Sequence, residues 1–456
     1  MKKIERRAAL CLLLALALFA GLCLFCFRFV TRGGQWASFP SNRHLYDRSG
    51  RLISGAIADR DGDILSDIVE GNRTFYLDET VRRATLHAVG DRQGNIGTGA
   101  LHAFADQLSG YNLITGGYSP VGSQRTMYLT LDAAFNVTAY KALGGQKGTV
   151  GVYNYKTGEI LCMVSTPAFD PDNPPENFDD EQYEGVFVNR FLSSAIVPGS
   201  IFKTVTLNAA IENIPDLYDR TWECTGSTII GGANITCPSA HGSLNIQSAF
   251  AHSCNGVFGQ LAAEMGGSVM QQYVDKAGLT GSLSVDGIST MKGTFAFQDE
   301  DKGQLAWSGV GQGKDALNPC SMMVYMGAIA SGGKSAVPRL IDSIDTGSLL
   351  PGGLFRTKQT KELVTASSAE ALRTMLRNNV QQTYGTDRFP EGACAKSGTA
   401  EVGGGKSPNA WFAGFLDNPN HPYAFIVLVE NGGGGASVAG EVASQVLNTI
   451  VNKMSN

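Results

Sequence analysis

A long uncharged segment near the start of the chain constrains the fold more than any other feature. It runs from residue 8 to residue 27 and ends at Arg28, and four basic residues precede it: Lys2, Lys3, Arg6 and Arg7. Twenty helical residues at about 1.5 Å each span about 30 Å, the thickness of the hydrocarbon core of a membrane. A cleavable signal peptide has a shorter apolar region, of about 7–15 residues, followed by a small-x-small cleavage site. The sequence shows no clean site of this kind, so we expect an uncleaved transmembrane anchor.

The charges around this segment predict the orientation of the chain. Basic flanks stay on the cytoplasmic side of a membrane, so we expect a cytoplasmic N-terminus. The body, from about residue 33 onward, is then extracellular or periplasmic. No second apolar run of this length is present. The sequence therefore predicts a single-pass protein of the cell membrane with one large external body.

Composition bounds the classes of protein to which this body can belong. A chain of 456 residues has room for two or three domains. Its 43% hydrophobic and 17% charged residues are typical of a folded protein with a sizeable core. The formal net charge of -5 leaves no basic excess to neutralise phosphates, which argues against a nucleic-acid partner.

The nine cysteines fall into two groups. Cys11, Cys23 and Cys26 lie in or beside the apolar segment and are interpreted as apolar filler, whereas the other six lie outside, where disulfides persist. Cys224 and Cys237 flank a Gly-rich loop and are close enough in sequence to pair, and the sequence leaves open whether they do. The one C-x-x-C, at Cys23 and Cys26, lies within the apolar segment and is no zinc pattern, and no H-E-x-x-H is present, so the sequence predicts no metal site and no metal catalysis.

The external body divides into two parts by composition. Residues 33–147 are polar and mixed, with short strand-like pieces and a helix-like stretch at 99–110, which indicates an irregular α+β pedestal. Two apolar, β-branched runs then flank NYKTGE within residues 148–167, the pattern of a β-hairpin. We predict a cytoplasmic stub and anchor (1–32), a non-catalytic pedestal or dimerisation-type domain (33–147) and a third domain, from residue 148 to residue 456.

The third domain has strands at both ends and helices between them. Helix-like segments lie at 199–213, 256–266 and 318–333. Strand-like segments return at 394–402, 409–417 and 423–432, the last two as an antiparallel pair, before a final helix. This order predicts an α/β (α+β) domain in which one antiparallel sheet, joined from distant parts of the sequence, is packed by helices.

Three short motifs that contain serine or lysine occur several times. S-x-x-K begins at Ser200, Ser289 and Ser331, S-x-N begins at Ser243, Ser253 and Ser407, and K-[ST]-G begins at Lys156 and Lys396. A single match of this length carries little information. Only the S-x-x-K at Ser200 is followed by an S-x-N and then by a K-[ST]-G, whereas the match at Lys156 precedes all the S-x-x-K and S-x-N matches and is interpreted as a hairpin turn.

Ser200 and Lys203 lie one helical turn apart in VPGSIFKTVT. A serine hydroxyl is a weak nucleophile until a base removes its proton. A lysine three residues further on lies on the same helix face, and desolvation beside a second cation lowers its pKa so that it can act as that base. The helix start adds a positive end where an acyl oxyanion would form. The alternative for this stretch is an ordinary helix start with a surface lysine.

The ordered set resembles the class B penicillin-binding proteins, which are monofunctional D,D-transpeptidases of bacterial cell-wall synthesis. The similarity runs from about residue 120 to the end and includes LTLDAAFNVTAYKAL, GTVGVYNYKTGEILCMVSTPAFDP, HGSLNIQSAFAHSCNGVFGQLA, GVGQG and KSGTAEV. Within that family the chain is most similar to the short elongation or sporulation type. The resemblance implies the penicillin-binding transpeptidase fold for residues 148–456.

The resemblance also implies the roles of the reacting groups. Ser200 would attack the carbonyl between the two terminal D-alanines of a stem peptide, and Lys203 would accept its proton. Ser253 would relay a proton to the leaving amine, and Asn255 would contact the lysine and the substrate backbone. Ser253 is preferred over Ser243 because AHSCNGVF matches the family context, and the Ser243 match is interpreted as a helix cap.

The K-S-G-T segment would bind the substrate. The charge of Lys396 would keep the catalytic lysine neutral and attract the substrate carboxylate, to which Ser397 and Thr399 would donate hydrogen bonds. Gly398 would let the backbone approach the substrate. The backbone N–H groups of Ser200 and Thr399 would form the oxyanion hole.

The resemblance implies stem peptides or lipid-linked precursor strands as substrates, acylation by β-lactams and no cofactor. The sequence shows no segment like a glycosyltransferase domain, so the family implies a multipass glycan polymerase in the membrane as a partner. The alternatives are a D,D-carboxypeptidase, a β-lactamase, and a non-catalytic scaffold or β-lactam sensor that binds such a polymerase. The expected anchor and pedestal disfavour the first two, and the complete set of motif residues disfavours the third.

Overall fold

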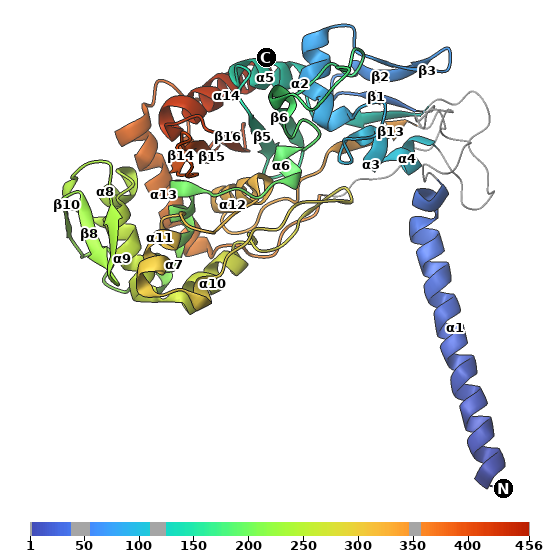
Figure 1. The fold of residues 1–456 in the computed structure, drawn as a ribbon, viewed down its shortest axis with the longest axis horizontal. Helices are drawn as coiled ribbons and strands as arrows, with labels where there is room; N and C mark the ends of the chain where they lie inside the picture. Colours follow the sequence, from blue (N-terminus) through green and yellow to red (C-terminus); the bar gives the residue numbers. More distant parts are fainter. Residues whose placement is uncertain (1, 38–54, 110–124, 346–356, 456) are drawn as a thin grey trace.

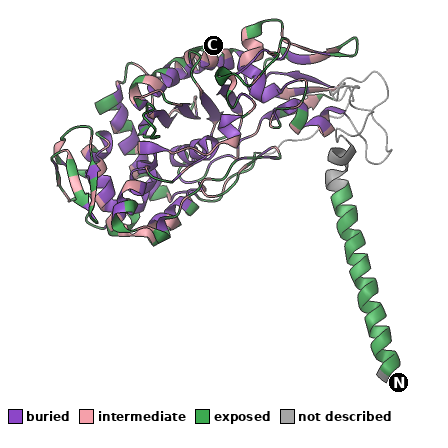
Figure 2. Cartoon of the chain, viewed as in Figure 1, coloured by how far each residue is buried: buried purple, intermediate pink, exposed green. Residues whose placement is uncertain are grey.

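The structure is a computed structural model that describes residues 2–37, 55–109, 125–345 and 357–455 (Figure 1). Helix α1 (Lys2–Ala37) projects from the body as a separate long helix. Within the described residues, the segment Lys3–Phe29 is the one helix long and apolar enough to cross a membrane. Its side chains are exposed along the helix (Figure 2). The anchor predicted from the sequence is therefore one continuous helix that leaves its apolar surface uncovered.

The body is built around a five-stranded antiparallel sheet. Its strand order is β14-β15-β16-β5-β6, with bounds β5 (Gly148–Asn154), β6 (Ile160–Thr166), β14 (Ala393–Ala400), β15 (Asn409–Leu416) and β16 (Tyr423–Val429). The predicted hairpin forms β5 and β6, and β16 pairs with β5 to join the two ends of the domain. The predicted antiparallel sheet from distant sequence is confirmed.

Helices cover both faces of this sheet, which explains why β6, β15 and β16 are nearly continuous apolar runs. On one face, α12 (Pro319–Ala330), buried along its whole length, packs against β15 and β16. On the other face, α14 (Gly440–Met454) and α5 (Ala133–Ala142) pack against β16 and β6. The sheet is therefore the middle of three layers (Figure 1). The fold is the predicted α/β (α+β) arrangement.

A second five-stranded sheet lies nearer to α1. Its order is β13-β4-β1-β2-β3, with bounds β1 (Ala56–Ala58), β2 (Ile64–Val69), β3 (Asn72–Phe75), β4 (Thr126–Leu129) and β13 (Ile341–Asp345). Strand β13 thus brings residues from the last third of the chain into a sheet of the pedestal region. Asp78 caps α2 (Glu79–Val89) beside this sheet, and α3 (Ala100–Ala103) and α4 (Ala105–Ser109) divide the helix expected at 99–110. The boundary at residue 147 stays a prediction.

The end of the body away from α1 carries helices and small hairpins (Figure 1). The turn η2 (Gly199–Phe202) continues into α7 (Lys203–Asn213), which packs against α9 (Asn255–Met265) and α13 (Ala366–Asn379). Helix α11 (Lys302–Gly309) packs beside α9. Residues 222–244, called the flap below, form β7 (Trp222–Cys224) paired with β10 (Gly242–Leu244), and β8 (Ser227–Ile230) paired with β9 (Ala233–Thr236). The helix α8 (Ile246–Ala251) leads from the flap to α9.

Candidate active site

Ser200 lies in a turn that presses against the edge of the central sheet. Gly199 has a left-handed φ of 57°, and a Cβ there would lie 2.7 Å from the carbonyl oxygen of Thr399. Only glycine fits this conformation and this approach. Trp411 of β15 donates from Nε1 to the carbonyl of Val197 at 2.9 Å, which fixes the start of the same turn. The turn that carries Ser200 is therefore held against β14 and β15.

The side chain of Lys203 joins three motif residues. Its Nζ lies 3.1 Å from Ser200 Oγ, 3.0 Å from Ser253 Oγ and 2.6 Å from the Oδ1 of Asn255. It also lies 2.6 Å from the backbone carbonyl of Ser253. Lys203 has 0% exposure. One buried amine is thus within hydrogen-bond distance of two serine hydroxyls.

Burial changes the protonation of this amine. Desolvation lowers the pKa of Lys203 to about 7, opposed by the nearby thiol groups of Cys254 and Cys237. Burial also lowers the pKa of Lys396 well below its ordinary value, and the charge of Lys203 lowers it further. The two lysines are fully buried. A neutral amine at Lys203 is therefore accessible near neutral pH, as a general base requires.

The turn before α9 aims the S-x-N residues at Lys203. Ser253 has a left-handed φ of 55°, which is uncommon for a residue with a side chain. Cys254 is the N-cap of α9. Asn255 donates from Nδ2 to the carbonyl of Thr236 in the flap at 2.7 Å, so its Oδ1 is the atom that faces the lysine.

The K-S-G-T segment lies on β14, the edge strand of the central sheet. Gln312 donates to the carbonyl of Thr399 at 3.2 Å, so this carbonyl points away from β15. In a strand, the N–H of a residue lies on the same side as its C=O, so the N–H of Thr399 also points off the sheet. The Tyr384 hydroxyl lies 2.9 Å from Ser397 Oγ and accepts from the Ser397 N–H at 2.9 Å.

Gly398 has a different close neighbour from the one expected. A Cβ at this position would lie 2.9 Å from the carbonyl of Pro198 and 3.1 Å from the backbone N of Ile201. The backbone that closely approaches Gly398 in the structure is thus the turn that carries Ser200. The glycine allows β14 and this turn to pack together.

These residues border a pocket of about 640 Å³. Its lining residues are Ser200, Thr236, Cys237, Pro238, His252, Ser253, Asn255, Trp307, Val310, Gln312, Ser397, Thr399 and Glu401. Lys203 and Lys396 are buried behind this lining. The structure therefore brings the three motifs, separated by nearly 200 positions in the sequence, to one pocket.

The sequence matches the family described as penicillin binding protein transpeptidase domain over residues 148–448. The chain belongs to the penicillin-binding protein transpeptidase family. It is 28% identical over 320 residues to the peptidoglycan D,D-transpeptidase PbpA of Mycolicibacterium smegmatis, which covers 65% of this chain and 64% of PbpA. The chain thus spans a little under two thirds of the length of this relative.

Solved structures of the family have the same fold. The D,D-transpeptidase domain of a peptidoglycan glycosyltransferase from Eggerthella lenta aligns with a TM-score of 0.76 and 25% identity, over 88% of this chain and 98% of that one. Penicillin-binding protein A from M. tuberculosis, in a ceftriaxone acyl-enzyme complex, aligns with a TM-score of 0.76 and 21% identity, over 87% and 97%. The predicted resemblance to class B penicillin-binding proteins and their fold is confirmed.

The other motif matches have structural roles elsewhere in this penicillin-binding protein. Asn245 caps α8 in a capping box with Ser248, as expected for the match at Ser243. Lys156 lies in the β5–β6 turn, where Gly158 has a φ of 84°. Ser331 ends α12 and donates to the carbonyl of Gly327 at 2.9 Å.

Sequence reasoning missed two groups of residues at this site. Tyr384 binds the K-S-G-T strand from a segment without a recognisable motif, and Gln312 binds it from GVGQG, a segment matched to the family without a role for this glutamine. Cys224, Cys237, His241 and Cys254 gather beside the pocket and form the one group of potential metal ligands found in the described part of the chain. The Sγ atoms of Cys224 and Cys237 lie 3.9 Å apart, and no disulfide joins them. The sequence contains these four potential ligands within 31 residues, but their spacing matches no common zinc motif.

Proposed function

We propose that the chain is a serine D,D-transpeptidase that cross-links the stem peptides of peptidoglycan through an acyl-enzyme. The observation that carries this proposal is the position of the Lys203 amine, 3.1 Å from Ser200 Oγ and 3.0 Å from Ser253 Oγ at one pocket. A nucleophile, a base and a proton relay are thus within hydrogen-bond reach of one another.

In the first half of the reaction, Ser200 Oγ attacks the carbonyl between the two terminal D-alanines. Its proton passes to the neutral amine of Lys203. The backbone N–H groups of Ser200 and Thr399 stabilise the oxyanion. When the C–N bond breaks, the leaving amine of D-alanine takes a proton from Lys203 through the hydroxyl of Ser253. The products are free D-alanine and an ester on Ser200.

In the second half, the amine of a neighbouring strand attacks the ester carbonyl and loses a proton through the same relay. The C–O bond to Ser200 breaks, and Ser200 Oγ regains its proton from Lys203. A new amide joins the two strands. Asn255 would hold Lys203 between the two serines during both steps, since its Oδ1 lies 2.6 Å from Nζ.

The edge of β14 is suited to hold an extended peptide. An edge strand offers unpaired backbone groups to a ligand strand, and the N–H of Thr399 points off the sheet. The terminal carboxylate would be bound by the hydroxyls of Ser397 and Thr399. A carboxylate anion close to Lys396 would favour the charged form of this amine, so substrate binding would leave Lys203 neutral. A β-lactam would acylate the same serine because its carbonyl mimics the scissile amide.

The placement of the chain follows from α1. Basic residues precede the apolar segment, so the N-terminus would be cytoplasmic and the catalytic domain (148–456) external. Residues 33–147 would form a non-catalytic pedestal, with 1–32 as stub and anchor. A multipass glycan polymerase in the membrane would supply the glycan strands, and α1 and the pedestal are the surfaces nearest to it.

Covalent labelling of the full-length chain in detergent with a fluorescent penicillin tests the nucleophile. Wild type and Ser243→Ala should label equally, since Ser243 belongs to the flap, whereas Ser200→Ala should not label. Labelling that survives Ser200→Ala overturns the assignment. Product analysis with stem peptides and an amine acceptor then separates transpeptidation from hydrolysis. Release of D-alanine without a cross-linked product would indicate a D,D-carboxypeptidase, and labelling without either product a scaffold or sensor.

A further inference from the structure

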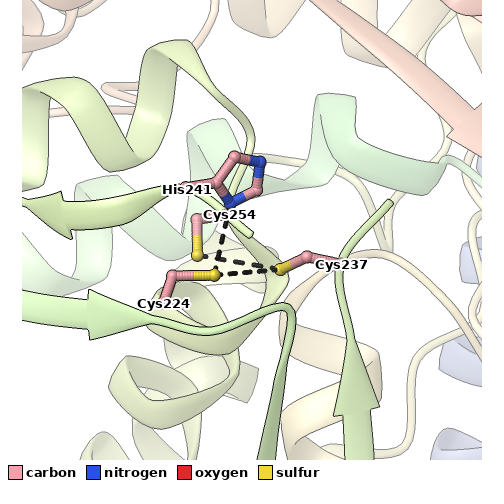
Figure 3. A group of neighbouring side chains, drawn as sticks. All are labelled: Cys224, Cys237, His241 and Cys254. Carbon is pink, nitrogen blue, oxygen red and sulfur yellow. Dashed lines mark hydrogen bonds between the residues drawn. The ribbon is translucent and has the colours of Figure 1, made fainter. Parts of the chain in front are cut away.

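Four side chains with metal-binding atoms converge beside the active-site pocket (Figure 3). Cys224 ends β7, Cys237 follows β9, His241 precedes β10 and Cys254 caps α9. Their ligand atoms all lie within 4.8 Å of one another. Three separate segments of the flap and the start of a core helix thus meet at one point.

The distances between these atoms match a tetrahedral metal site. Thiolate sulfurs about 2.3 Å from a tetrahedral Zn²⁺ lie about 3.8 Å apart. Cys237 Sγ lies 3.9 Å from Cys224 Sγ and 3.8 Å from Cys254 Sγ, and Cys224 Sγ lies 3.3 Å from His241 Nδ1. A disulfide requires about 2.05 Å, and one disulfide would leave the third thiol and the imidazole unused. The arrangement serves four ligands of one ion better than any pair.

The surroundings of the cluster support its sulfur atoms. The backbone N–H of Asn255 donates to Cys237 Sγ at 3.2 Å. The N–H of Cys237 donates to the carbonyl of Gly226 at 2.9 Å, and that of His241 to the carbonyl of Cys224 at 3.1 Å. Cys224 and Cys254 are buried, whereas Cys237 and His241 are half-buried. Backbone hydrogen bonds of this kind orient the ligands in metal sites.

Apart from this cluster, the flap has few buried side chains and few backbone pairings to stabilise it. Four of its residues are buried: Cys224, Ile230, Ile235 and Leu244. Its two sheets have two strands each, and isolated two-stranded sheets are marginally stable in water. Ile230 and Ile235 form a small cluster with Ala306 of α11, separate from the main cores. A small loop-rich segment of this kind is typically stabilised by a disulfide or a structural metal.

We propose that Cys224, Cys237, His241 and Cys254 bind one structural Zn²⁺ that holds the flap against the turn carrying Ser253 and Asn255. Three thiolates and one imidazole favour zinc among divalent ions, and four protein ligands make a closed, non-catalytic site. The expectation from sequence that no metal is bound was based on catalytic patterns and on C-x-x-C, and this ligand set has neither.

The ion would act on the reaction through the backbone. Cys254 is covalently joined to Ser253 and Asn255, whose side chains contact Lys203. Coordination of its Sγ would fix the turn in which Ser253 has its left-handed φ. The carbonyl of Thr236, next to the ligand Cys237, accepts from Asn255. The four ligands are positioning residues for the relay rather than catalytic groups.

The test measures zinc in the full-length chain, purified in detergent under reducing conditions and equilibrated with Zn²⁺. About one Zn²⁺ per chain is expected for wild type and for Ser200→Ala, and at least tenfold less for Cys237→Ser and His241→Ala. Cys320→Ser is the matched control, since Cys320 is a buried thiol of α12 outside the cluster. Because Ser200→Ala retains the site, failure of the nucleophile assignment would not affect this result.

A second measurement does not depend on the folding of a variant. Replacement of the ion in wild type by Co²⁺ should give the visible absorption of a tetrahedral thiolate complex. Removal of the ion with a chelator should make Cys224, Cys237 and Cys254 reactive to an alkylating reagent while Cys320 stays protected. Wild type without zinc after equilibration overturns the proposal. So does a disulfide between any two of the three cysteines in the chain isolated with zinc.

Discussion

The two walls of the active-site pocket are held by different kinds of interaction. One wall consists of β14 and the turn that carries Ser200. It is fixed by a continuous ladder to β15, by close glycine contacts and by cores on both faces of the sheet. The other wall consists of the flap and the turn that carries Ser253, where short hairpins meet at a cluster of sulfur and nitrogen atoms. The first wall depends on packing and the second on a few polar contacts.

This difference predicts a difference in local stability. A segment with few buried apolar contacts opens at a lower free energy than the core strands of the same protein. Changes at β14 should therefore affect global unfolding together with activity. Changes at the flap should affect activity and local order while global unfolding changes less. Lys203 is the side chain that links the two walls, because its amine contacts both Ser200 and Ser253.

The largest effect is expected for Lys203→Met. Methionine fills a similar volume but cannot accept the proton of Ser200, and loss of a general base costs about 10²–10⁴-fold in rate. The acylation rate constant with a chromogenic cephalosporin should fall by this amount. Lys334→Met, in another S-x-x-K match with an exposed lysine, is the control and should match wild type. Equal rates for both variants would show that another group accepts the proton.

Removal of the proposed zinc should destabilise the wall formed by the flap and leave the wall formed by β14 nearly unchanged. An ion present at a hundredfold excess over its dissociation constant stabilises the bound state by about 2.7 kcal/mol, so amide hydrogen exchange in the flap should accelerate about 10²-fold after chelation. Exchange in β14 and β15 should change little, because the ladder between them contains no ligand. Measurement by mass spectrometry before and after chelation compares the walls in one sample. Equal acceleration in both would contradict the comparison.

The wall built by packing was predictable from the sequence. Strands β15 and β16 are apolar runs rich in aromatic residues, β14 carries the K-S-G-T motif, and the order of the motifs at Ser200, Ser253 and Lys396 pointed to one pocket. Each of these patterns lies within a short segment, so it can be recognised without knowledge of the folded structure. A single sheet joined from both ends of the domain was predicted, whereas the strands that make the junction, β16 and β5, were identified only in the structure.

The other features depend on contacts that no local pattern encodes. The cysteine and histidine ligands are thirteen, four and thirteen positions apart, so only the folded flap brings them together. Tyr384 lies in the π-helical segment η4 (Val380–Tyr384) and reaches Ser397 through tertiary packing. Strand β13 joins the second sheet across some 200 positions, and its sequence, IDSID, does not read as a core strand.

Gly398→Ala tests the packed wall. A Cβ at this position would lie 2.9 Å from the carbonyl of Pro198, and overpacking of this kind costs about 1–3 kcal/mol. Both the free energy of unfolding and the acylation rate should fall, because the added methyl group separates β14 from the turn that carries Ser200. Gly97→Ala is the control, since nothing lies within 4 Å of a Cβ there. An unchanged Tm with normal acylation would show that this wall is looser than described.

The pH dependence of acylation should report the base that links the walls. Burial lowers the pKa of Lys203 to about 7, so the amine is neutral above this pH and protonated below it. The acylation rate constant should rise about tenfold per pH unit below pH 7 and level off above it. The nearby thiol groups of Cys254 and Cys237 oppose this lowering of the Lys203 pKa, and the charge of Lys203 in turn lowers the pKa of Lys396. A plateau reached only near pH 10 would mean that Lys203 has the pKa of an ordinary lysine.

The smallest effect is expected for Tyr384→Phe, which removes one hydroxyl from behind the packed wall. The ring would keep its edge contact with Phe412, but the N–H and Oγ of Ser397 would each lose a partner at 2.9 Å. The net cost of such hydrogen bonds is about 0.5–1.5 kcal/mol, which corresponds to about a two- to tenfold loss in acylation efficiency. Because Ser397 would bind the carboxylate, the loss should fall on substrate binding rather than on the maximal rate. Tyr218→Phe, at an exposed tyrosine, controls for the substitution itself. An unchanged affinity would mean that the backbone ladder to β15 alone positions Ser397, so that this wall needs no polar support at all.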